Sequence, residues 1–357
     1  MDFSSVKSSY YNDYTVQSAG MTDYAVSLRN GFYRLKMGGY LASSDVTETD
    51  SLPSETIVFT SAKVTDSGSS TDLTLTCADR PAYNGAMDEN GRFVLTFYGV
   101  DSDSAPLPTI RVNPLVKSCD LIRLDDRVRY CFTLVNPENF YGFDLTYAEG
   151  EIVVSMKNPM ALDFSSDQPL TGVKIVLDAG HGGWDRGAAG ADPSMNEKDL
   201  NLEITLAASE LLADLGADVL LTRADDTYID LYQRMDFLEE TRPDLCISVH
   251  QNSMGYTTDI TRVRGTLALW TMDSGVMLAD AVGRAVADAF GRNFRGAQYQ
   301  ALAVCRNPKF PSALIEVGFI TSVEEYEATA SKDGIHTAAQ GIADGVLNYF
   351  RRQAAYR

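Results

Sequence analysis

Long apolar runs are absent from this chain of 357 residues. No stretch of about 18 apolar residues occurs, so no segment is expected to cross a membrane as a helix. The first residues, Met1 to Ser5, lack the basic start and apolar continuation of a secretory signal. Two locations fit this start: the cytoplasm, or an extracellular, cell-wall or periplasmic site if a signal has been removed.

Cysteine is scarce and never occurs in the CxxC spacing of a cysteine metal site. The number of cysteines is 5, which is odd, so at least one thiol stays unpaired. Cys119 and Cys131 could form a disulfide within one domain. In a chain with so few cysteines, these side chains are more often small buried apolar groups, and we expect that here.

Basic residues are outnumbered, with 30 Lys and Arg against 49 Asp and Glu and a formal net charge of −19. Nucleic-acid binding relies on clustered Lys and Arg that replace counterions, so the composition argues against a nucleic-acid partner. Anionic lipid surfaces would also be repelled. The acidity chiefly favours solubility and indicates no function by itself.

Residues 1–160 have the pattern of an all-β, sandwich-like domain. Short runs rich in β-branched and aromatic residues alternate with turn formers, and helical spacing is missing. The opening residues, about 1–20, form either a tail or a first strand. Strands are expected at 57–60, 73–76, 93–98, 130–135 and 151–156. This spacing predicts an antiparallel sandwich, followed by a linker at residues 161–172.

Residues 173–357 change to an alternation of strands and helices. Such alternation predicts an α/β domain in which helices flank a mostly parallel sheet. Strands are expected at 174–178, 218–222, 245–249, 265–270 and 313–317, and helices at 200–215, 231–240, 275–290 and 337–351.

Only 3 histidines occur in the chain, and two of them follow strands of the predicted sheet. His181 comes shortly after the strand that ends at Asp178, and His250 directly follows another strand. Ligands bind beyond the carboxyl ends of strands in open α/β sheets, so the two imidazoles can converge there. A carboxylate (Asp178, Glu197 or Glu316) would complete a three-ligand zinc site with one open position.

Taken one at a time, these residues have simpler interpretations. A single histidine is more often a core or capping residue. Glu197 precedes a helix, whose positive end a carboxylate favours, and Glu316 could be a salt-bridge partner. Glu316, however, lies inside an apolar strand, where an unpartnered carboxylate is costly. A metal or a catalytic role would explain its position.

Five sequence blocks occur in the order of a known family. They are DAGHGGWDRGA at 178–188, NEKDLNL at 196–202, the segment from Thr222-Arg223 to Arg234, SVHQN at 248–252 and EVGFIT at 316–321. Together they resemble the zinc-dependent N-acetylmuramoyl-L-alanine amidases of type 3, over residues 174–352. Any one block is weak evidence, whereas five in order are specific.

The resemblance implies a zinc hydrolase that cleaves the amide between the lactyl group of N-acetylmuramic acid and L-alanine in peptidoglycan. His181, Glu197 and His250 match the family's Zn2+ ligands. Glu316 matches its catalytic glutamate, which takes a proton from water and returns it to the leaving nitrogen. Ser253 departs from the alanine that usually follows the asparagine. Peptidoglycan is the implied partner, and we expect a monomer outside the cytoplasm.

Several further residues are expected to support this site. Asp178 is expected to orient His181. Arg223 and Arg234 are expected to pair with acids and hold helices, with substrate contact as the lesser alternative. Asn252 is placed in the same supporting or substrate-binding group. His336 has no motif and is expected at the surface or as a helix cap.

Two alternatives to the amidase remain open. One is a zinc peptidase or amidase of the same fold that acts on another amide, and the other is a non-catalytic peptidoglycan-binding protein that retains zinc. The short connection at 252–265 leaves little room for the long helix that blocks the zinc in some relatives, so we expect an uncovered site. Residues 55–157 are similar to the AMIN-like wall-targeting module by strand rhythm alone, and a purely structural role stays equally open.

Overall fold

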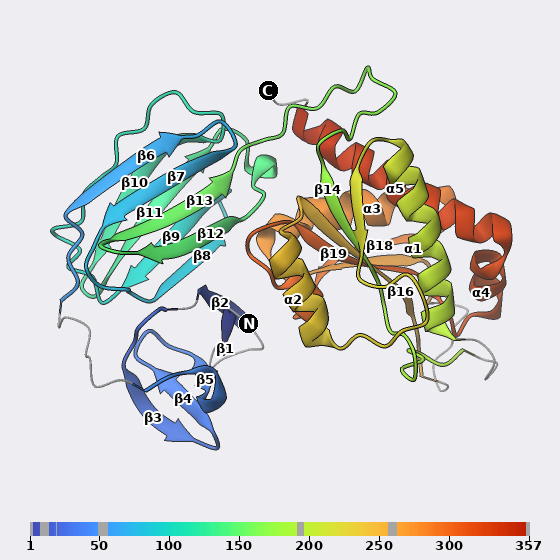
Figure 1. Ribbon diagram of the computed structural model, residues 1–357, viewed down its shortest axis with the longest axis horizontal. Helices are drawn as coiled ribbons and strands as arrows, with labels where there is room; N and C mark the ends of the chain where they lie inside the picture. Colours follow the sequence, from blue (N-terminus) through green and yellow to red (C-terminus); the bar gives the residue numbers. More distant parts are fainter. Residues whose placement is uncertain are drawn as a thin grey trace. The chain divides into compact units, whose positions relative to one another are not determined.

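The computed structural model divides into two compact units, Met1–Met160 and Ala161–Arg357 (Figure 1). It describes residues 3–7, 14–18, 20–48, 56–190, 196–255 and 263–354. Each unit has its own sheets, and we describe each by itself. Within the described residues, no helix is both long and apolar enough to cross a membrane.

The first unit begins with a small antiparallel sheet that the sequence did not separate from the sandwich. Its strand order is β2-β1-β5-β4-β3. The strands are β1 (Phe3–Lys7), β2 (Tyr14–Ser18), β3 (Ala25–Arg29), β4 (Phe32–Leu35) and β5 (Tyr40–Ala42). The opening residues therefore contribute strands and not a tail. Leu35 and Leu41 form the small buried core of this sheet.

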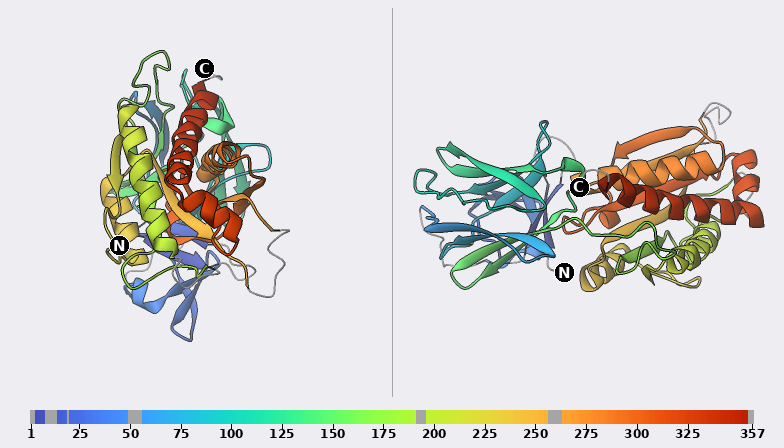
Figure 2. Two further views of the ribbon diagram at one scale, coloured as in Figure 1. Left: turned by 90° about the vertical axis from the view of Figure 1, so that its right-hand side faces the viewer. Right: turned by 90° about the horizontal axis from the view of Figure 1, so that it is seen from above.

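The rest of the first unit is an antiparallel sandwich of two four-stranded sheets, with orders β10-β11-β9-β8 and β12-β13-β7-β6 (Figure 2). One sheet has β8 (Tyr83–Met87), β9 (Arg92–Tyr98), β10 (Val116–Leu124) and β11 (Arg127–Leu134). The other has β6 (Ser61–Asp66), β7 (Ser70–Thr76), β12 (Phe143–Ala148) and β13 (Glu151–Lys157). The predicted sandwich is confirmed. The strand expected at 57–60 is wrong, because only Ile57 makes an isolated bridge there.

The cysteines of this unit are buried in the sandwich as unpaired thiols. Burial alternates along β7, and along β9 as far as Leu95, as expected when one face of each sheet packs against the other sheet. Cys119 and Cys131 lie on adjacent strands, but both are free thiols, as are the other three cysteines. Burial raises the pKa of the Cys119 thiol to about 12. The expectation of buried, unpaired thiols is confirmed.

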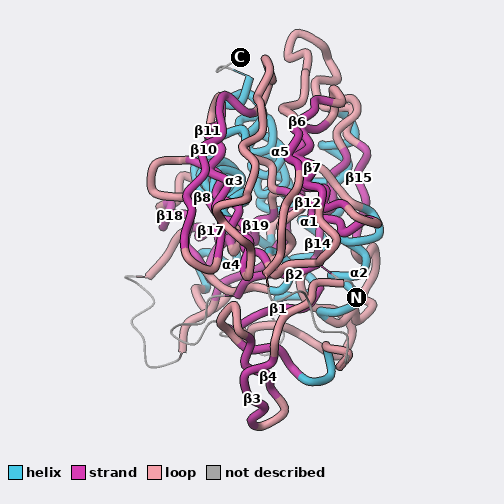
Figure 3. Tube along the Cα trace, turned by 90° about the vertical axis from the view of Figure 1, so that its left-hand side faces the viewer, coloured by secondary structure: helices cyan, strands magenta, loops and turns pink. Residues whose placement is uncertain are grey.

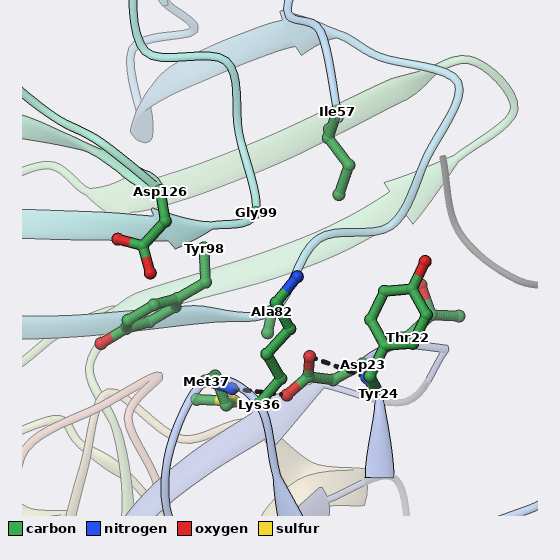
Figure 4. Close-up of a pocket in the computed structure, with 10 residues that line it drawn as sticks. All are labelled: Thr22, Asp23, Tyr24, Lys36, Met37, Ile57, Ala82, Tyr98, Gly99 and Asp126. Carbon is green, nitrogen blue, oxygen red and sulfur yellow. Dashed lines mark hydrogen bonds between the residues drawn. The ribbon is translucent and has the colours of Figure 1, made fainter. Parts of the chain in front are cut away.

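A small pocket lies between the five-stranded sheet and the sandwich (Figure 4). Asp23 is its most buried acid, and burial raises the pKa of this carboxyl. The carboxylate already accepts hydrogen bonds from the backbone amides of Tyr24 and Met37, both at 2.8 Å. Because the chain itself satisfies this acid, the pocket does not resemble a functional centre.

The second unit is built on one six-stranded sheet of order β15-β14-β16-β19-β17-β18. The strands are β14 (Lys174–Ala179), β15 (Asp218–Leu221), β16 (Leu245–Asn252), β17 (Thr266–Trp270), β18 (Phe294–Tyr299) and β19 (Ser312–Phe319). Pairing is parallel except between β17 and β19, so the predicted mostly parallel sheet is confirmed. β18 was not predicted.

Helices cover both faces of this sheet (Figure 1), and Figure 3 colours helices cyan and strands magenta. On one face pack α1 (Glu197–Asp214), α3 (Val276–Ala289) and α5 (Lys332–Ala354). On the other face, α2 (Leu231–Thr241) buries Leu238 against Val176 and Cys246. A capping box between Asp230 and Gln233 starts α2. The short α4 (Val323–Ala330) was not predicted.

The sheet order fixes where chemistry can occur. The central strands β14, β16 and β19 run parallel to one another, so their carboxyl ends meet at one edge. The loop that contains His181 follows β14, while His250 and Glu316 lie near the ends of β16 and β19. Residues far apart in the sequence are thus brought to one place.

Candidate active site

The loop after β14 presents His181 in an unusual backbone conformation. Its φ angle is 60°, a left-handed value that non-glycine residues rarely adopt. Such strain persists only where the surroundings enforce it, and it is common at functional sites. Here a short backbone pairing between Gly182 and Asp185 closes the loop, with hydrogen bonds of 3.0 and 3.1 Å.

His181, Glu197 and His250 form a compact cluster of three side chains. The two imidazole rings lie 4.9 Å apart at an interplanar angle of 78°. Glu197 lies between them, with Oε2 at 3.3 Å from His181 Nε2 and Oε1 at 2.9 Å from His250 Nδ1. One donor atom from each residue can be chosen so that all three lie within 4.8 Å of one another. The structure therefore brings together the three residues that the sequence singled out.

Glu197 is held firmly as the first residue of α1. It is only 2% exposed, and its carboxylate accepts backbone hydrogen bonds from Ala188 (2.6 Å) and Gln251 (3.1 Å). Burial alone would raise the pKa of this carboxyl, but the hydrogen bonds and charges of the two histidines hold the pKa well below its usual value. The group is thus an anion in a fixed orientation. Its place at the positive end of a helix is compatible with metal ligation.

Asp185 orients His181, and this corrects the role expected of Asp178. Asp185 Oδ2 lies 2.8 Å from His181 Nδ1, while its Oδ1 accepts the Gly187 amide at 3.1 Å. Burial opposes protonation of His181, but Glu197 and Asp185 outweigh it and raise the pKa of the imidazole to about 9. A carboxylate on the far nitrogen of a metal-binding histidine fixes the ring and its tautomer. The sequence signal was the acid four residues after His181.

Asp178 instead anchors the sheet beneath the site. Its carboxylate accepts hydrogen bonds from Thr222 Oγ1 (2.7 Å) and Ser248 Oγ (2.6 Å), and it pairs with Arg234. Burial tends to raise the pKa of Asp178, whereas Arg234 and the two hydroxyls keep the pKa low. Arg234 also donates to the carbonyl of His181 at 2.7 Å. The expected pairing of Arg234 with an acid is confirmed.

Arg223 does not pair with an acid among the described residues, contrary to the expectation. Its guanidinium donates to the backbone carbonyls of Ala179, Gly180, Lys198 and Asp225, at 2.8–2.9 Å. The side chain is 4% exposed, so it is buried beneath the loop. The side chain of Arg223 thus stabilises the loop after β14 by binding backbone carbonyls at its start.

Two glycines leave the space that the cluster needs. A Cβ atom at Gly180 would lie 2.3 Å from the ring of His250. At Gly187, where φ is 72°, it would lie 2.5 Å from Glu197 Oε2 and 2.6 Å from His181 Cδ2. Any side chain at either position would displace a member of the cluster.

Glu316 faces the cluster from the neighbouring strand. In the register of β16 and β19, Glu316 is the direct partner of His250. Its Oε2 is buried and has no hydrogen-bond partner among the described residues. Burial is the main cause that raises the pKa of this carboxyl to about 7, with a further contribution from Glu197. An acid poised near neutrality can both take and give a proton.

The donor set suits a divalent transition metal, above all zinc. Two imidazoles and one carboxylate are the ligands of hydrolytic zinc sites that keep a position open. The supporting contacts of Asp185, Ala188 and Gln251 are those that orient such ligands. Because a ligand must be deprotonated, a metal at this cluster would displace a proton from His181.

The remaining predicted residues lie at the margins of the site. Asn252 ends β16, and its side chain accepts the backbone amide of Ser253 at 2.8 Å. His336 is exposed in the first turns of α5, as expected of a surface residue. Part of the connection at 252–265, residues 256–262, lies outside the described residues, so the uncovered site stays a prediction. Sequence reasoning gave no role to Asn201 and Gln251, which are buried and hydrogen-bonded to Glu197.

The fold and the cluster define a class: an open α/β sheet that carries a candidate hydrolytic metal centre at its carboxyl edge. The family follows from sequence comparison. Residues 175–348 match the family described as N-acetylmuramoyl-L-alanine amidase (Amidase_3). The second unit matches this family over most of its length, which confirms the resemblance drawn from the five blocks.

Two curated proteins are similar to this chain in sequence. The chain is 31% identical over 186 residues to the probable cell wall amidase LytH of Staphylococcus epidermidis, which is 52% of this chain and 61% of that protein. It is 32% identical over 185 residues to the probable cell wall amidase LytH of Staphylococcus aureus, covering 51% and 60%. The chain thus spans less than two thirds of the length of these curated relatives.

A solved structure is also similar. N-acetylmuramoyl-L-alanine amidase AmiC2 of Nostoc punctiforme is 32% identical, and the match covers 51% of this chain and 99% of that chain with a TM-score of 0.48.

Proposed function

We propose that the protein hydrolyses the amide bond between the lactyl group of N-acetylmuramic acid and L-alanine in peptidoglycan. The proposal rests on the family of residues 175–348 and on the cluster at the sheet edge. It includes a location outside the cytoplasm, where peptidoglycan lies, and a monomeric enzyme. The catalytic part is residues 173–357.

In this proposal His181, Glu197 and His250 hold Zn2+. When bound there, zinc supplies a Lewis acid that polarises an amide carbonyl and lowers the pKa of water. Asp185 keeps the Nε2 atom of His181 directed at the ion by holding Nδ1. Glu197 brings a negative charge, which its contacts with Ala188 and Gln251 fix in place.

Glu316 moves the proton. Its Oε2 accepts a proton from the attacking water and then delivers it to the leaving nitrogen of L-alanine, so the carboxyl ends the cycle as it began. A pKa raised to about 7 makes both transfers feasible near neutral pH. The observation that carries the proposal is the buried Oε2 of Glu316, which has no hydrogen-bond partner among the described residues and belongs to the strand neighbour of His250.

Digestion of purified peptidoglycan tests this function. Incubation with the zinc-loaded protein should release peptides with new L-alanine amino termini and leave the glycan strands intact. Chelation should stop the release, and added zinc should restore it. Activity that survives both chelation and Glu316→Ala would refute the mechanism.

The same digestion separates the two alternatives. New amino termini at other residues, or cleavage of free peptides alone, would indicate a zinc amidase or peptidase with another substrate. Binding to peptidoglycan with no new amino termini would indicate a non-catalytic protein.

The role of the first unit is a separate proposal. We propose that its sandwich attaches the enzyme to the wall or to a partner, as the AMIN-like module does. Pull-down of residues 1–160 with insoluble peptidoglycan tests this, and an equal amount in the supernatant with and without peptidoglycan would count against wall attachment.

A further inference from the structure

An exposed aromatic pair stands beside the candidate metal cluster. Trp184, in the loop after β14, is 76% exposed, and Tyr228, in the loop before α2, is 36% exposed. Their rings pack on each other with centroids 4.3 Å apart and planes inclined by 35°. Single exposed apolar side chains are common, whereas adjoining exposed rings form a patch of the kind that marks a binding surface.

The two loops that carry the pair are joined tightly. The amide of Gly183 donates to Asp226 Oδ1 at 2.8 Å, and Lys198 Nζ donates to the carbonyl of Gly183 at 2.8 Å and forms an ion pair with Asp226. A Cβ atom at Gly183 would lie 2.9 Å from the backbone nitrogen of Tyr228. The aromatic pair is therefore preorganised, which lowers the entropic cost of binding.

The same loop also connects the pair to the cluster. Trp184 directly precedes Asp185, whose carboxylate holds His181. One short loop therefore carries both a ring of the pair and the residues His181 and Asp185.

We propose that the Trp184–Tyr228 pair is a stacking platform for a sugar ring of the glycan strand, next to the amide that is cut. This inference rests on the proposed amidase function and adds the part of the site that holds the saccharide. A pyranose has an apolar C–H face and a polar rim of hydroxyls. Polar groups for such a rim are available in the same two loops, since exposed Arg186 and half-exposed Asp226 each lie two residues from one of the rings.

The backbone around the platform does not favour the peptide as occupant. Extended peptides bind largely through main-chain hydrogen bonds to free backbone groups. Here the amides of Gly182, Gly183, Asp185 and Gly187 are all used within the two loops. A flat aromatic surface beside these occupied amides suits a ring that stacks better than an extended peptide.

Tryptophan fluorescence can observe the platform directly. The chain has only 2 tryptophans, so the variant Trp270→Phe leaves Trp184 as the sole indole. Peptide-free glycan strands titrated into this metal-free, full-length variant should shift the emission to shorter wavelength, because stacking removes the indole from water. The free stem peptide, titrated in parallel, should leave the emission unchanged.

Matched substitutions test the contribution of each ring. Trp184→Ala should weaken glycan binding, measured by calorimetry, about tenfold, and should raise KM on peptidoglycan with kcat little changed. Trp184→Tyr should restore most of the affinity. Tyr299→Ala is the control, because Tyr299 is also a half-exposed aromatic, with its ring centroid 5.4 Å from that of Trp270, and it lies on β18, at the other end of the strand order from β15. It should bind glycan as the wild type does.

Either of two results would overturn the platform. One is equal glycan affinity of the wild type and Trp184→Ala, and the other is an emission shift with the stem peptide and none with glycan. Because binding is measured without metal, these results are independent of hydrolysis. Glycan binding without new L-alanine amino termini would refute the proposed function alone, whereas hydrolysis with unchanged KM in Trp184→Ala would refute the platform alone.

Discussion

The two units differ in the kind of polar group that they bury. In the described part of the first unit, the buried polar side chains are hydroxyls and amides: Thr71, Thr96, Ser102, Asn136, Asn139 and Asn158. In the second unit, buried charges occur as well: Asp178, Glu197, Lys198, Arg223, Arg234, Asp244 and Glu325. Burying a charge is expensive unless it is paired, so a fold that buries many uses them for support or chemistry.

Within the second unit, buried or nearly buried carboxylates again fall into two kinds. Glu325 is satisfied, because it accepts the backbone amides of Gly265 (2.9 Å) and Phe319 (2.8 Å). Glu316 has one buried oxygen with no hydrogen-bond partner in the part of the chain that the structure describes. These two acids differ in whether the chain satisfies their oxygens, and this difference is the reason for assigning a structural role to Glu325 and a reactive one to Glu316.

The largest expected effect comes from substituting Glu316 and tests its contrast with Glu325 directly. Glu316→Gln should lower kcat on peptidoglycan by about 10²–10⁴-fold, since proton transfer is lost while shape is kept. Zinc content, measured by mass spectrometry of the metal, should stay at the wild-type value. The matched variant Glu325→Gln should lower the melting temperature and leave kcat nearly unchanged. Equal losses of kcat in both would erase the distinction between them.

A core truncation tests whether the two units are independent. Phe93 is fully buried in the sandwich and contacts the rings of Phe132, Phe140 and Phe143. Phe93→Ala should lower the free energy of unfolding of the first unit by about 3–5 kcal/mol.

Thermal unfolding is recorded by calorimetry, and zinc release is followed over the same temperature range. In Phe93→Ala, only the transition of the first unit should shift to lower temperature. Zinc should stay bound until the second unit unfolds in the other transition. The reciprocal variant Phe310→Ala, in the core of the second unit, should move the zinc-linked transition instead. A single shared transition in both variants would argue against independence.

A smaller effect concerns the orientation of a ligand. Asp185→Asn should weaken zinc binding by about 10–100-fold, because the carboxylate no longer fixes the Nδ1 side of His181. Competition with a chromophoric chelator measures this affinity. Asp126→Asn, which removes a carboxylate paired with Arg127 in the first unit, serves as the control and should leave zinc affinity unchanged.

The smallest effect is a pH dependence of the metal-free protein. Folding raises the pKa of Glu316 from 4.5 to about 7, so its contribution to stability is complete below pH 4.5 and is lost as the pH rises through 7. Folding likewise raises the pKa of His181 from 6.5 to about 9, and its contribution is lost as the pH rises through 9. The melting temperature of Glu316→Gln relative to wild type should therefore increase between pH 4.5 and 7 and then level off. A constant difference across that range would contradict the raised pKa of Glu316.

Much of the second unit could be predicted because its signals are local. Apolar strands and the helical spacing after Glu197 follow from side-chain periodicity. The positions of β18 and α4 were missed, since their residues have little periodic contrast. In the first unit, the separate five-stranded sheet was missed because strand rhythm does not show which strands pair.

The sequence alone determined the fold class, the order of the blocks and the types of side chain that can bind zinc. Only the tertiary structure decided how those side chains are supported. It assigned Asp185, and not Asp178, to His181, turned Arg223 toward carbonyl groups and left Glu316 unsatisfied beside His250. The physical reason is that hydrogen bonds between distant residues depend on strand register and loop conformation to within about an ångström, which local patterns of residue type do not encode.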